Sequence, residues 1–200
     1  DGVISFNNGS IRTQEQAKET NLYVGTGSNP GDLISIANSF LFHTPGILGE
    51  NLHLGYVSPN KRIRITDNYV AGGHVALDLT RWEQAIVKGN TFYVSSMGFW
   101  SAQTLVSAKV NLPFSSSAYE WNSNTYYDGA LPFGNGTRYT FTLTGLKNDL
   151  GGGILSFRDW RQGSGFDSSS SYQPTSPAGI HVAIRPNTYE QGRGHVVVYN

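Results

Sequence analysis

Three ionisable residues in the first half of the chain, His53, Arg64 and Asp78, each lie between two aliphatic residues. Because side chains alternate between the two faces of a β-strand, aliphatic neighbours that point into a core leave the central residue pointing outward. A base, a cation and an acid on one outer face are what β-elimination on a uronic acid requires. The base removes the α-proton, the cation neutralises the carboxylate, and the acid assists the leaving oxygen. We therefore predict these three as candidate catalytic residues. The alternative is that they are solvated surface residues, or an ion pair between strands that contributes about 0–1 kcal/mol.

Four further residues could hold a sugar beside this group. Arg81, Trp82 and Glu83 follow Asp78 at a predicted turn, and Trp100 lies further along, so we predict all four as substrate-binding residues. The two tryptophan rings would stack on sugar rings. Asp78 and Glu83 are also the only close pair of carboxyl groups in this region, and glycoside hydrolysis needs two carboxyl groups about 5–9.5 Å apart. Hydrolysis is therefore a second candidate reaction.

The other ionisable residues predict neither a metal site nor a cofactor. The histidines outside the candidate group lack the i, i+4 spacing of a zinc site, and no cluster of carboxylates has the density that calcium needs. The chain has no cysteine, which excludes disulfides, thiolate metal sites and cysteine nucleophiles.

Composition narrows the class of partner. The chain of 200 residues carries 14 basic and 14 acidic residues, so nucleic acid is not an expected partner. Charged residues make up 14% of the chain, against roughly 25% in most soluble domains, and Asn, Ser, Thr, Gly and Tyr take their place. Such a surface forms hydrogen bonds and stacking contacts, which favours a polysaccharide as partner. No apolar run approaches the ~18 residues that cross a bilayer, so no membrane insertion is expected.

A short unit repeats along the chain with the order apolar, x, x, Asn, small or aromatic. Residues 65–69 match residues 87–91 at a spacing of 22, and residues 121–125 follow after a further 34. Residues 36–40 fit the same frame with Ser39 at the Asn position.

The spacing of 22 residues is typical of one coil of a parallel β-helix, whose short strands stack on the next coil at ~4.8 Å. Aliphatic residues would then form an internal column. Asn68, Asn90 and Asn124 would form a ladder of amides, since Asn tolerates the left-handed turn conformation and carries a donor and an acceptor. A loop around residues 97–107 would absorb the longer spacing. The alternative is a β-sandwich with coincidental Asn turns.

Five runs carry a resemblance to a known family: residues 4–9, 51–56, 88–93, 121–127 and 185–194. They resemble bacterial right-handed parallel β-helix repeat proteins, which are distantly similar to pectate lyases and to β-helix glycoside hydrolases. The resemblance covers most of the chain. It implies association with carbohydrate and a location outside the cell, secreted or at the cell surface, without fixing a reaction. It also implies that both ends are cut, with earlier coils before the first unit and a β-sandwich-like extension after the last.

We therefore predict an all-β chain, a right-handed parallel β-helix with a C-terminal β-rich cap or partial β-sandwich. The coils are predicted over residues 1–128, and the cap or start of the extension over residues 129–200, because the Asn frame fades near Asp128. In this later part we expect strands at residues 141–144, 154–157 and 181–184, and a Ser-rich surface loop at residues 167–176.

Two functions are compatible with these observations. The first is a secreted carbohydrate-associated enzyme, a polysaccharide lyase or glycoside hydrolase, with a groove on the sheet bearing His53, Arg64 and Asp78. The second is a non-catalytic β-helix with a structural, adhesive or polysaccharide-binding role, which the low charge and the missing carboxylate cluster favour. The oligomeric state is not predicted.

Overall fold

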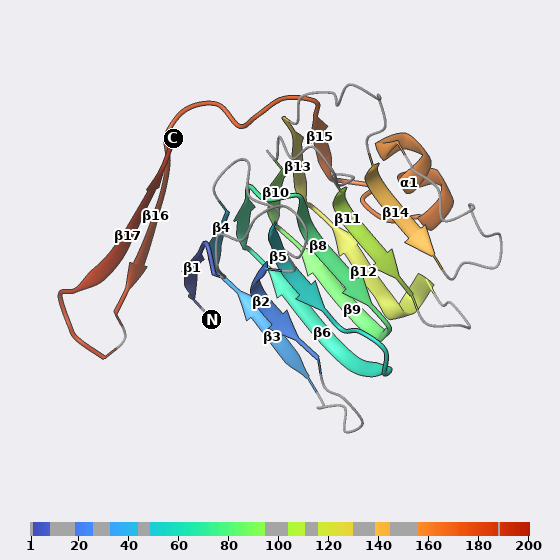
Figure 1. Cartoon of the computed structure of the whole chain (residues 1–200), viewed down its shortest axis with the longest axis horizontal. Helices are drawn as coiled ribbons and strands as arrows, with labels where there is room; N and C mark the ends of the chain where they lie inside the picture. The colour runs from blue at the N-terminus through green and yellow to red at the C-terminus, as the bar shows by residue number, and fades with distance from the viewer. Residues whose placement is uncertain are drawn as a thin grey trace.

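The computed structural model describes residues 2–8, 19–25, 33–43, 49–94, 104–110, 116–129, 139–144, 156–187 and 189–200. Within these ranges the protein is all-β. It has three parallel sheets and one antiparallel hairpin, together with the 3-10 turn η1 (Ser116–Ala118) and the helix α1 (Phe157–Ser164) (Figure 1).

The strands fall into three parallel sheets and the hairpin. Sheet A contains β1 (Ile4–Phe6), β4 (Phe40–Phe42), β7 (Tyr69–Ala71), β10 (Thr91–Val94), β13 (Thr125–Asp128) and β15 (Ser171–Gln173). Sheet B contains β2 (Glu19–Val24), β5 (Gly49–Leu54), β8 (Val75–Thr80), β11 (Thr104–Lys109) and β14 (Tyr139–Thr144). Sheet C contains β3 (Ile34–Ala37), β6 (Asn60–Thr66), β9 (Trp82–Lys88) and β12 (Tyr119–Asn122). The hairpin pairs β16 (His181–Pro186) with β17 (Gly194–Tyr199).

From β1 to β14 the chain passes through sheets A, B and C in constant cyclic order, and each strand pairs with the strand of the same sheet one circuit later. In sheet A, Tyr69 pairs with Thr91 and Thr91 with Thr125, which are the spacings of 22 and 34 seen in the repeat. The fold is thus a stack of parallel strands, compatible with a β-helix-like architecture. The prediction of an all-β chain with parallel stacking is confirmed.

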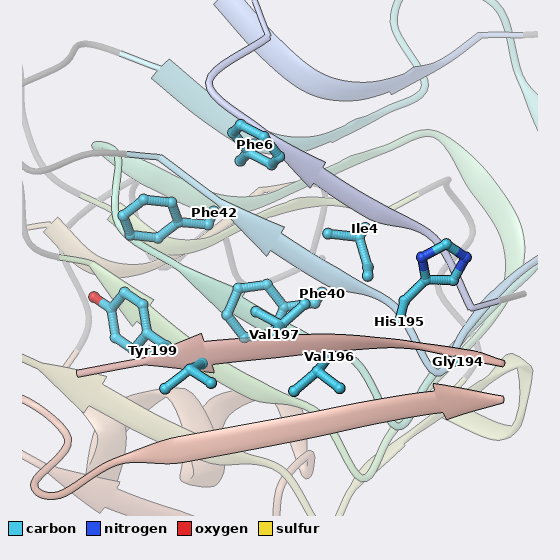
Figure 2. A pocket seen from close by; sticks show the side chains of 10 residues that line it. Ile4, Phe6, Phe40, Phe42, Gly194, His195, Val196, Val197 and Tyr199 are labelled. Carbon is cyan, nitrogen blue, oxygen red and sulfur yellow. The ribbon is translucent and has the colours of Figure 1, made fainter.

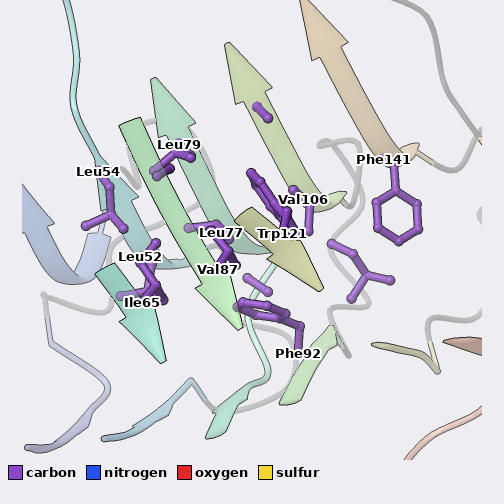
Figure 3. Close-up of a cluster of buried hydrophobic side chains, with 14 of the residues drawn as sticks. Leu52, Leu54, Ile65, Leu77, Leu79, Val87, Phe92, Val106, Trp121 and Phe141 are labelled. Atoms are coloured by element: carbon purple, nitrogen blue, oxygen red, sulfur yellow. The ribbon is translucent and has the colours of Figure 1, made fainter. Parts of the chain in front are cut away.

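The core lies between the three sheets and contains columns of aliphatic side chains together with aromatic rings such as Phe92, Trp121 and Phe141 (Figure 3). Leu52 pairs with Leu77 and Leu77 with Val106 in sheet B, while Ile65 pairs with Val87 in sheet C. All five side chains are fully buried. Burying such a side chain stabilises the fold by about 1.5–3 kcal/mol, so the repeated aliphatic positions account for the stacking.

The predicted asparagine ladder is present where sheet C turns into sheet A. Asn68 Nδ2 donates to Asn90 Oδ1 at 2.9 Å, and Asn90 Nδ2 donates to Asn124 Oδ1 at 3.1 Å. Ser39 begins the ladder, since its backbone N–H donates to Asn68 Oδ1 at 2.9 Å. Asp167 ends it by accepting from Asn124 Nδ2 at 3.1 Å. The repeat in the sequence is therefore a row of buried hydrogen bonds across successive circuits.

Of the two expected reasons for asparagine at these corners, the amide that donates and accepts is confirmed, and the left-handed conformation is wrong. The left-handed residue is the one before each ladder residue: Asn38, Asp67, Gly89 and Ser123 have φ of 52°, 56°, 70° and 58°. The ladder residue is selected for its amide, which donates and accepts at once, and its neighbour supplies the turn.

Three predicted loops or strands differ from the structure. Residues 97–103 lie outside the described ranges, but residues 104–107, expected in a loop, belong to β11. Ser156 and Phe157, expected in a strand, begin α1, because Ser156 Oγ accepts from Asp159 N at 3.1 Å and caps the helix; residues 154–155 are outside the described ranges. Ser171–Gln173, inside the expected Ser-rich loop, form β15, since they continue the pairing of sheet A.

The expected strands at 141–144 and 181–184 are present in β14 and β16. Both β14 and β15 follow Asp128 and still pair in parallel with the earlier strands of sheets B and A. The hairpin lies on the outer face of sheet A near β1 and β4 (Figure 1). There His181 stacks on Tyr69 with ring centroids 3.9 Å apart.

Candidate functional site

His53 and Asp78 are direct neighbours on the outer face of sheet B. They are Cα partners in the pairing of β5 with β8. Each is partly exposed between two buried leucines, as the alternation predicted. The same outward row begins at Tyr23 on β2 and continues to Ser107 on β11. Sheet B therefore brings a potential base and a potential acid within one interstrand spacing, about 4.8 Å at the backbone.

Glu50 completes this group and was not predicted. Its Oε2 lies 2.5 Å from His53 Nδ1. A carboxylate that accepts the Nδ1 proton fixes the imidazole tautomer and leaves Nε2 as the free acceptor for a second proton. The arrangement is therefore an oriented acid–base pair.

Two exposed tyrosines flank the same imidazole. Tyr23 stacks on His53 with ring centroids 5.3 Å apart, and Tyr56 lies at a centroid distance of 6.2 Å. Both tyrosine side chains are 57% exposed. Exposed aromatic rings beside polar groups are suited to stack on the apolar faces of sugar rings.

Asp78 is held in an environment that disfavours its charge. Burial raises the pKa of the Asp78 carboxyl, and this outweighs the hydrogen bond from Thr80 Oγ1 at 2.8 Å and the nearby charge of Lys109, which act to lower the pKa. A carboxyl group with a raised pKa retains its proton at higher pH, which suits a proton donor.

Asp78→Asn is expected to make the protein more stable than the wild type at neutral pH. A raised folded-state pKa stabilises the fold below the unfolded pKa of 3.8, and this contribution is lost as pH rises through the folded value. Asn cannot ionise and keeps an oxygen for Thr80, so the difference between the two proteins should vanish in acid. Urea unfolding at several pH values measures this. A variant less stable than the wild type at neutral pH would contradict it.

The structure does not bring Arg64 to this face. Arg64 lies on β6 in sheet C, where it pairs with Ser35 and Ile86. It is exposed and contributes to lowering the pKa of Glu120, after the larger effects of Lys88. The three residues expected on one groove therefore occupy two sheets. On sheet B the available cation is Lys109, two positions beyond Ser107.

Trp82 is not a sugar platform. Its side chain is 1% exposed and its Nε1 donates to the Leu54 carbonyl oxygen at 3.0 Å. Trp82 is the first residue after the corner at Arg81, and it points inward, whereas the sequence predicted that it faces a ligand. The indole consequently fills the core instead of facing a ligand.

The other predicted binding residues do not join the sheet B row. Arg81 is exposed at the corner between sheets B and C, with φ of 58° and its Nη1 donating to the Val57 carbonyl oxygen at 2.6 Å. Glu83 is exposed on β9 in sheet C, so it does not share the outer face of Asp78. Trp100 lies outside the described residues.

A second amide ladder passes through Asn51, the residue that follows Glu50. Asn21 Nδ2 donates to Asn51 Oδ1 at 2.7 Å, and Asn51 Nδ2 donates to the Gly72 carbonyl oxygen at 2.9 Å. A signal was available in the sequence, because Asn-Leu-Tyr-Val at 21–24 matches Asn-Leu-His-Leu at 51–54. That match aligns Tyr23 with His53 and would have identified the row.

Two hollows lie away from this row. One of about 540 Å³ lies between the hairpin and strands β1 and β4; its lining includes Phe6, Phe42, Tyr199 and His195 (Figure 2). The other, of about 510 Å³, lies beside α1 and includes Phe157, Arg158 and Arg161. Neither contains the paired acid and base of sheet B.

Among the described residues, no group of three or more His, Cys, Asp or Glu side chains is arranged to hold a metal ion. The helix in these ranges is too short and polar to cross a membrane. Comparison with protein-family models, with curated proteins and with solved structures gave no match. The function is therefore argued from the geometry of sheet B.

Proposed function

We propose that this chain is a right-handed parallel β-helix that associates with a polymeric carbohydrate outside the cell. The cyclic order of three parallel sheets supports the β-helix. The right hand is supported by chirality, since about 98% of crossovers between parallel strands of one sheet are right-handed.

The observation that carries the ligand class is the pair of exposed tyrosines beside the His53–Glu50 pair. Successive strands of sheet B place outward side chains in a row across the circuits. A polymer lying along that row contacts Tyr23, His53 and Asp78 in turn. Charged residues make up only 14% of the chain, which favours hydrogen bonding and stacking over ion pairing.

The row also carries the groups for bond cleavage. For β-elimination on a uronic acid, His53 removes the α-proton, Lys109 faces the sugar carboxylate, and Asp78 gives its proton to the leaving oxygen. For hydrolysis, Asp78 protonates the glycosidic oxygen while the His53–Glu50 pair accepts a proton from water. A non-catalytic binding role is the second candidate, favoured by the position of Arg64 on the other sheet.

The single variants Tyr23→Ala and Tyr56→Ala are each expected to weaken polysaccharide binding. Each ring offers a stacking surface, and loss of one aromatic contact of about 1–2 kcal/mol reduces affinity by about 5–30-fold. Affinity electrophoresis through gels containing neutral or uronic acid polymers measures the loss. Tyr189→Ala is the matched control, because Tyr189 is 95% exposed and lies on the hairpin loop. Equal retardation of all three variants and the wild type in every polymer would contradict the proposal.

The same polymers separate the candidate reactions. Elimination yields an unsaturated product that absorbs in the ultraviolet, whereas hydrolysis yields only new reducing ends. Either activity should be lost in Asp78→Asn and His53→Ala and kept in Glu83→Gln, whose carboxylate lies on sheet C. Binding without any product supports the non-catalytic role.

A further inference from the structure

The buried His43 and the partly buried His74 lie at the corners where the chain passes from sheet A to sheet B. His43 follows β4, is 0% exposed, and its backbone N–H donates to the Ala71 carbonyl oxygen at 2.9 Å. His74 precedes β8, and its backbone N–H donates to the Gly49 carbonyl oxygen at 3.0 Å. The two side chains interact electrostatically. Among the described residues, no hydrogen bond joins either histidine side chain to the outward row of sheet B.

Both histidines hold the start of β5. His43 Nε2 donates to the Glu50 carbonyl oxygen at 3.2 Å, and the His74 backbone N–H donates to the Gly49 carbonyl oxygen. A Cβ atom at Gly49 would lie 2.6 Å from His43 Cε1, so the imidazole packs directly on this glycine. The start of β5 is thus held by the His43 imidazole and the His74 backbone N–H, and the Asn21–Asn51 ladder follows at the next residue.

We propose that His43 and His74 are positioning residues for Glu50, and that through Glu50 they hold the His53 imidazole in register with Asp78. The proposal rests on the proposed function, because Glu50 matters only if the sheet B row is the binding site. Neither histidine touches the ligand; each acts through the Gly49–Glu50 backbone.

This arrangement requires neutral imidazoles. His43 Nδ1 and His74 Nδ1 are buried, and among the described residues they have no hydrogen-bond partner. Protonation would add a charge and an N–H group without an acceptor at each of these sites. Burial lowers the pKa of both histidines, and each imidazole also faces a further group, His74 for His43 and Glu50 for His74.

The sign of the pH effect follows from the lowered values. A histidine whose folded pKa lies below the unfolded value of 6.5 stabilises the fold above that value, and the contribution is lost as pH falls below it. Acid should therefore release β5 before the rest of the stack. The His53 imidazole contacts Glu50 directly, and the Asp78 carboxyl interacts with Glu50, His53 and Lys109, so His53 needs a separate control.

Hydrogen exchange followed by mass spectrometry tests the proposal without a ligand. In the wild type, amides of β5 should lose about tenfold in protection between pH ~7.5 and ~5.5, after correction for intrinsic rates, while amides of β9 keep theirs. In His43→Gln with His74→Gln the loss should be under about twofold, because Gln donates a hydrogen bond but does not titrate in this range. His53→Gln and His195→Gln should respond to pH as the wild type does.

Two results would overturn the proposal: equal pH response of β5 and β9, or an unchanged response in the double variant. If the double variant does not fold, the single variants give the same comparison. His43→Phe should expose β5 at neutral pH while His43→Gln does not, because only Gln restores the donor to Glu50. Affinity electrophoresis over the same pH range is the second readout. If the wild type binds a polymer but its β5 protection does not respond to pH, the positioning role alone is rejected. If its β5 protection responds to pH as expected but it binds no polymer, the proposed function alone is rejected.

Discussion

Asn90→Ala is expected to lower the free energy of unfolding by about 3–5 kcal/mol, because several buried groups lose their partners at once. Asn90 is 1% exposed. Its Nδ2 donates to the Ile65 carbonyl oxygen at 2.8 Å and to Asn124 Oδ1 at 3.1 Å. Its Oδ1 accepts from Asn68 N at 3.0 Å and from Asn68 Nδ2 at 2.9 Å. Removing the amide leaves polar groups of two circuits unpaired in the core.

Urea unfolding followed by far-ultraviolet circular dichroism measures this loss. Gln84→Ala is the matched control, because Gln84 carries the same amide group on the exposed face of β9; its effect should stay within about 0.5 kcal/mol. Asn90→Asp should also destabilise, since Asp keeps the acceptor but loses both donors. If the Ala variant behaved like Gln84→Ala, the ladder would contribute little and the stacking would rest on the aliphatic columns alone.

The ladder was predictable because its physical requirement is visible in the sequence. A buried amide that must donate to one circuit and accept from another leaves few choices of residue type, so Asn recurs at 68, 90 and 124. The inward aliphatic positions were predictable for the same reason, since each must fill an equivalent place in the core. The turn residues before the ladder were not, because Asn, Asp, Gly and Ser all adopt the left-handed conformation there.

The candidate site was predictable only in part, because alternation predicts which residues point outward but not which sheet they occupy. His53 and Asp78 are 25 residues apart, close to one circuit, and they meet on sheet B. Arg64 is 11 residues after His53, which carries it to the next sheet. Glu50 was missed because the alternation is broken near the corner before Leu52: Asn51 and Leu52 are both buried, so that simple alternation from Leu52 would point Glu50 inward. The inward turn of Trp82 after Arg81 has the same origin at the next corner.

A hydrogen-bond hub at the end of the ladder gives the second large effect. Asp167 is fully buried, and four side chains donate to its carboxyl group. Trp160 Nε1 and the Tyr126 hydroxyl donate to Oδ2 at 2.8 and 2.9 Å, while Asn124 Nδ2 and the Ser170 hydroxyl donate to Oδ1 at 3.1 and 2.5 Å. The hub joins α1, β13 and the ladder. It holds Trp160 against Phe141 and Trp121 at the end of the core, where the aromatic rings cover the last circuit.

Asp167→Ala is therefore expected to cost about 3–5 kcal/mol of unfolding free energy, because three buried donors and the partly buried Ser170 hydroxyl lose their acceptor together. Burial raises the pKa of the Asp167 carboxyl despite these donors, so ionising it is costly, and part of the loss should be recovered by a neutral side chain. Asp167→Asn keeps one oxygen for Asn124 and Ser170 and should lose less than the Ala variant. Glu83→Ala, which removes an exposed carboxylate of β9, should change the stability by under about 0.5 kcal/mol.

Tryptophan emission reports on the cap during urea unfolding: in Asp167→Ala a red shift from Trp160 should precede the loss of β-sheet signal. A single coincident transition at the wild-type urea concentration would show that α1 and the last circuit are held by apolar packing, and that the ladder does not need an acceptor at its end.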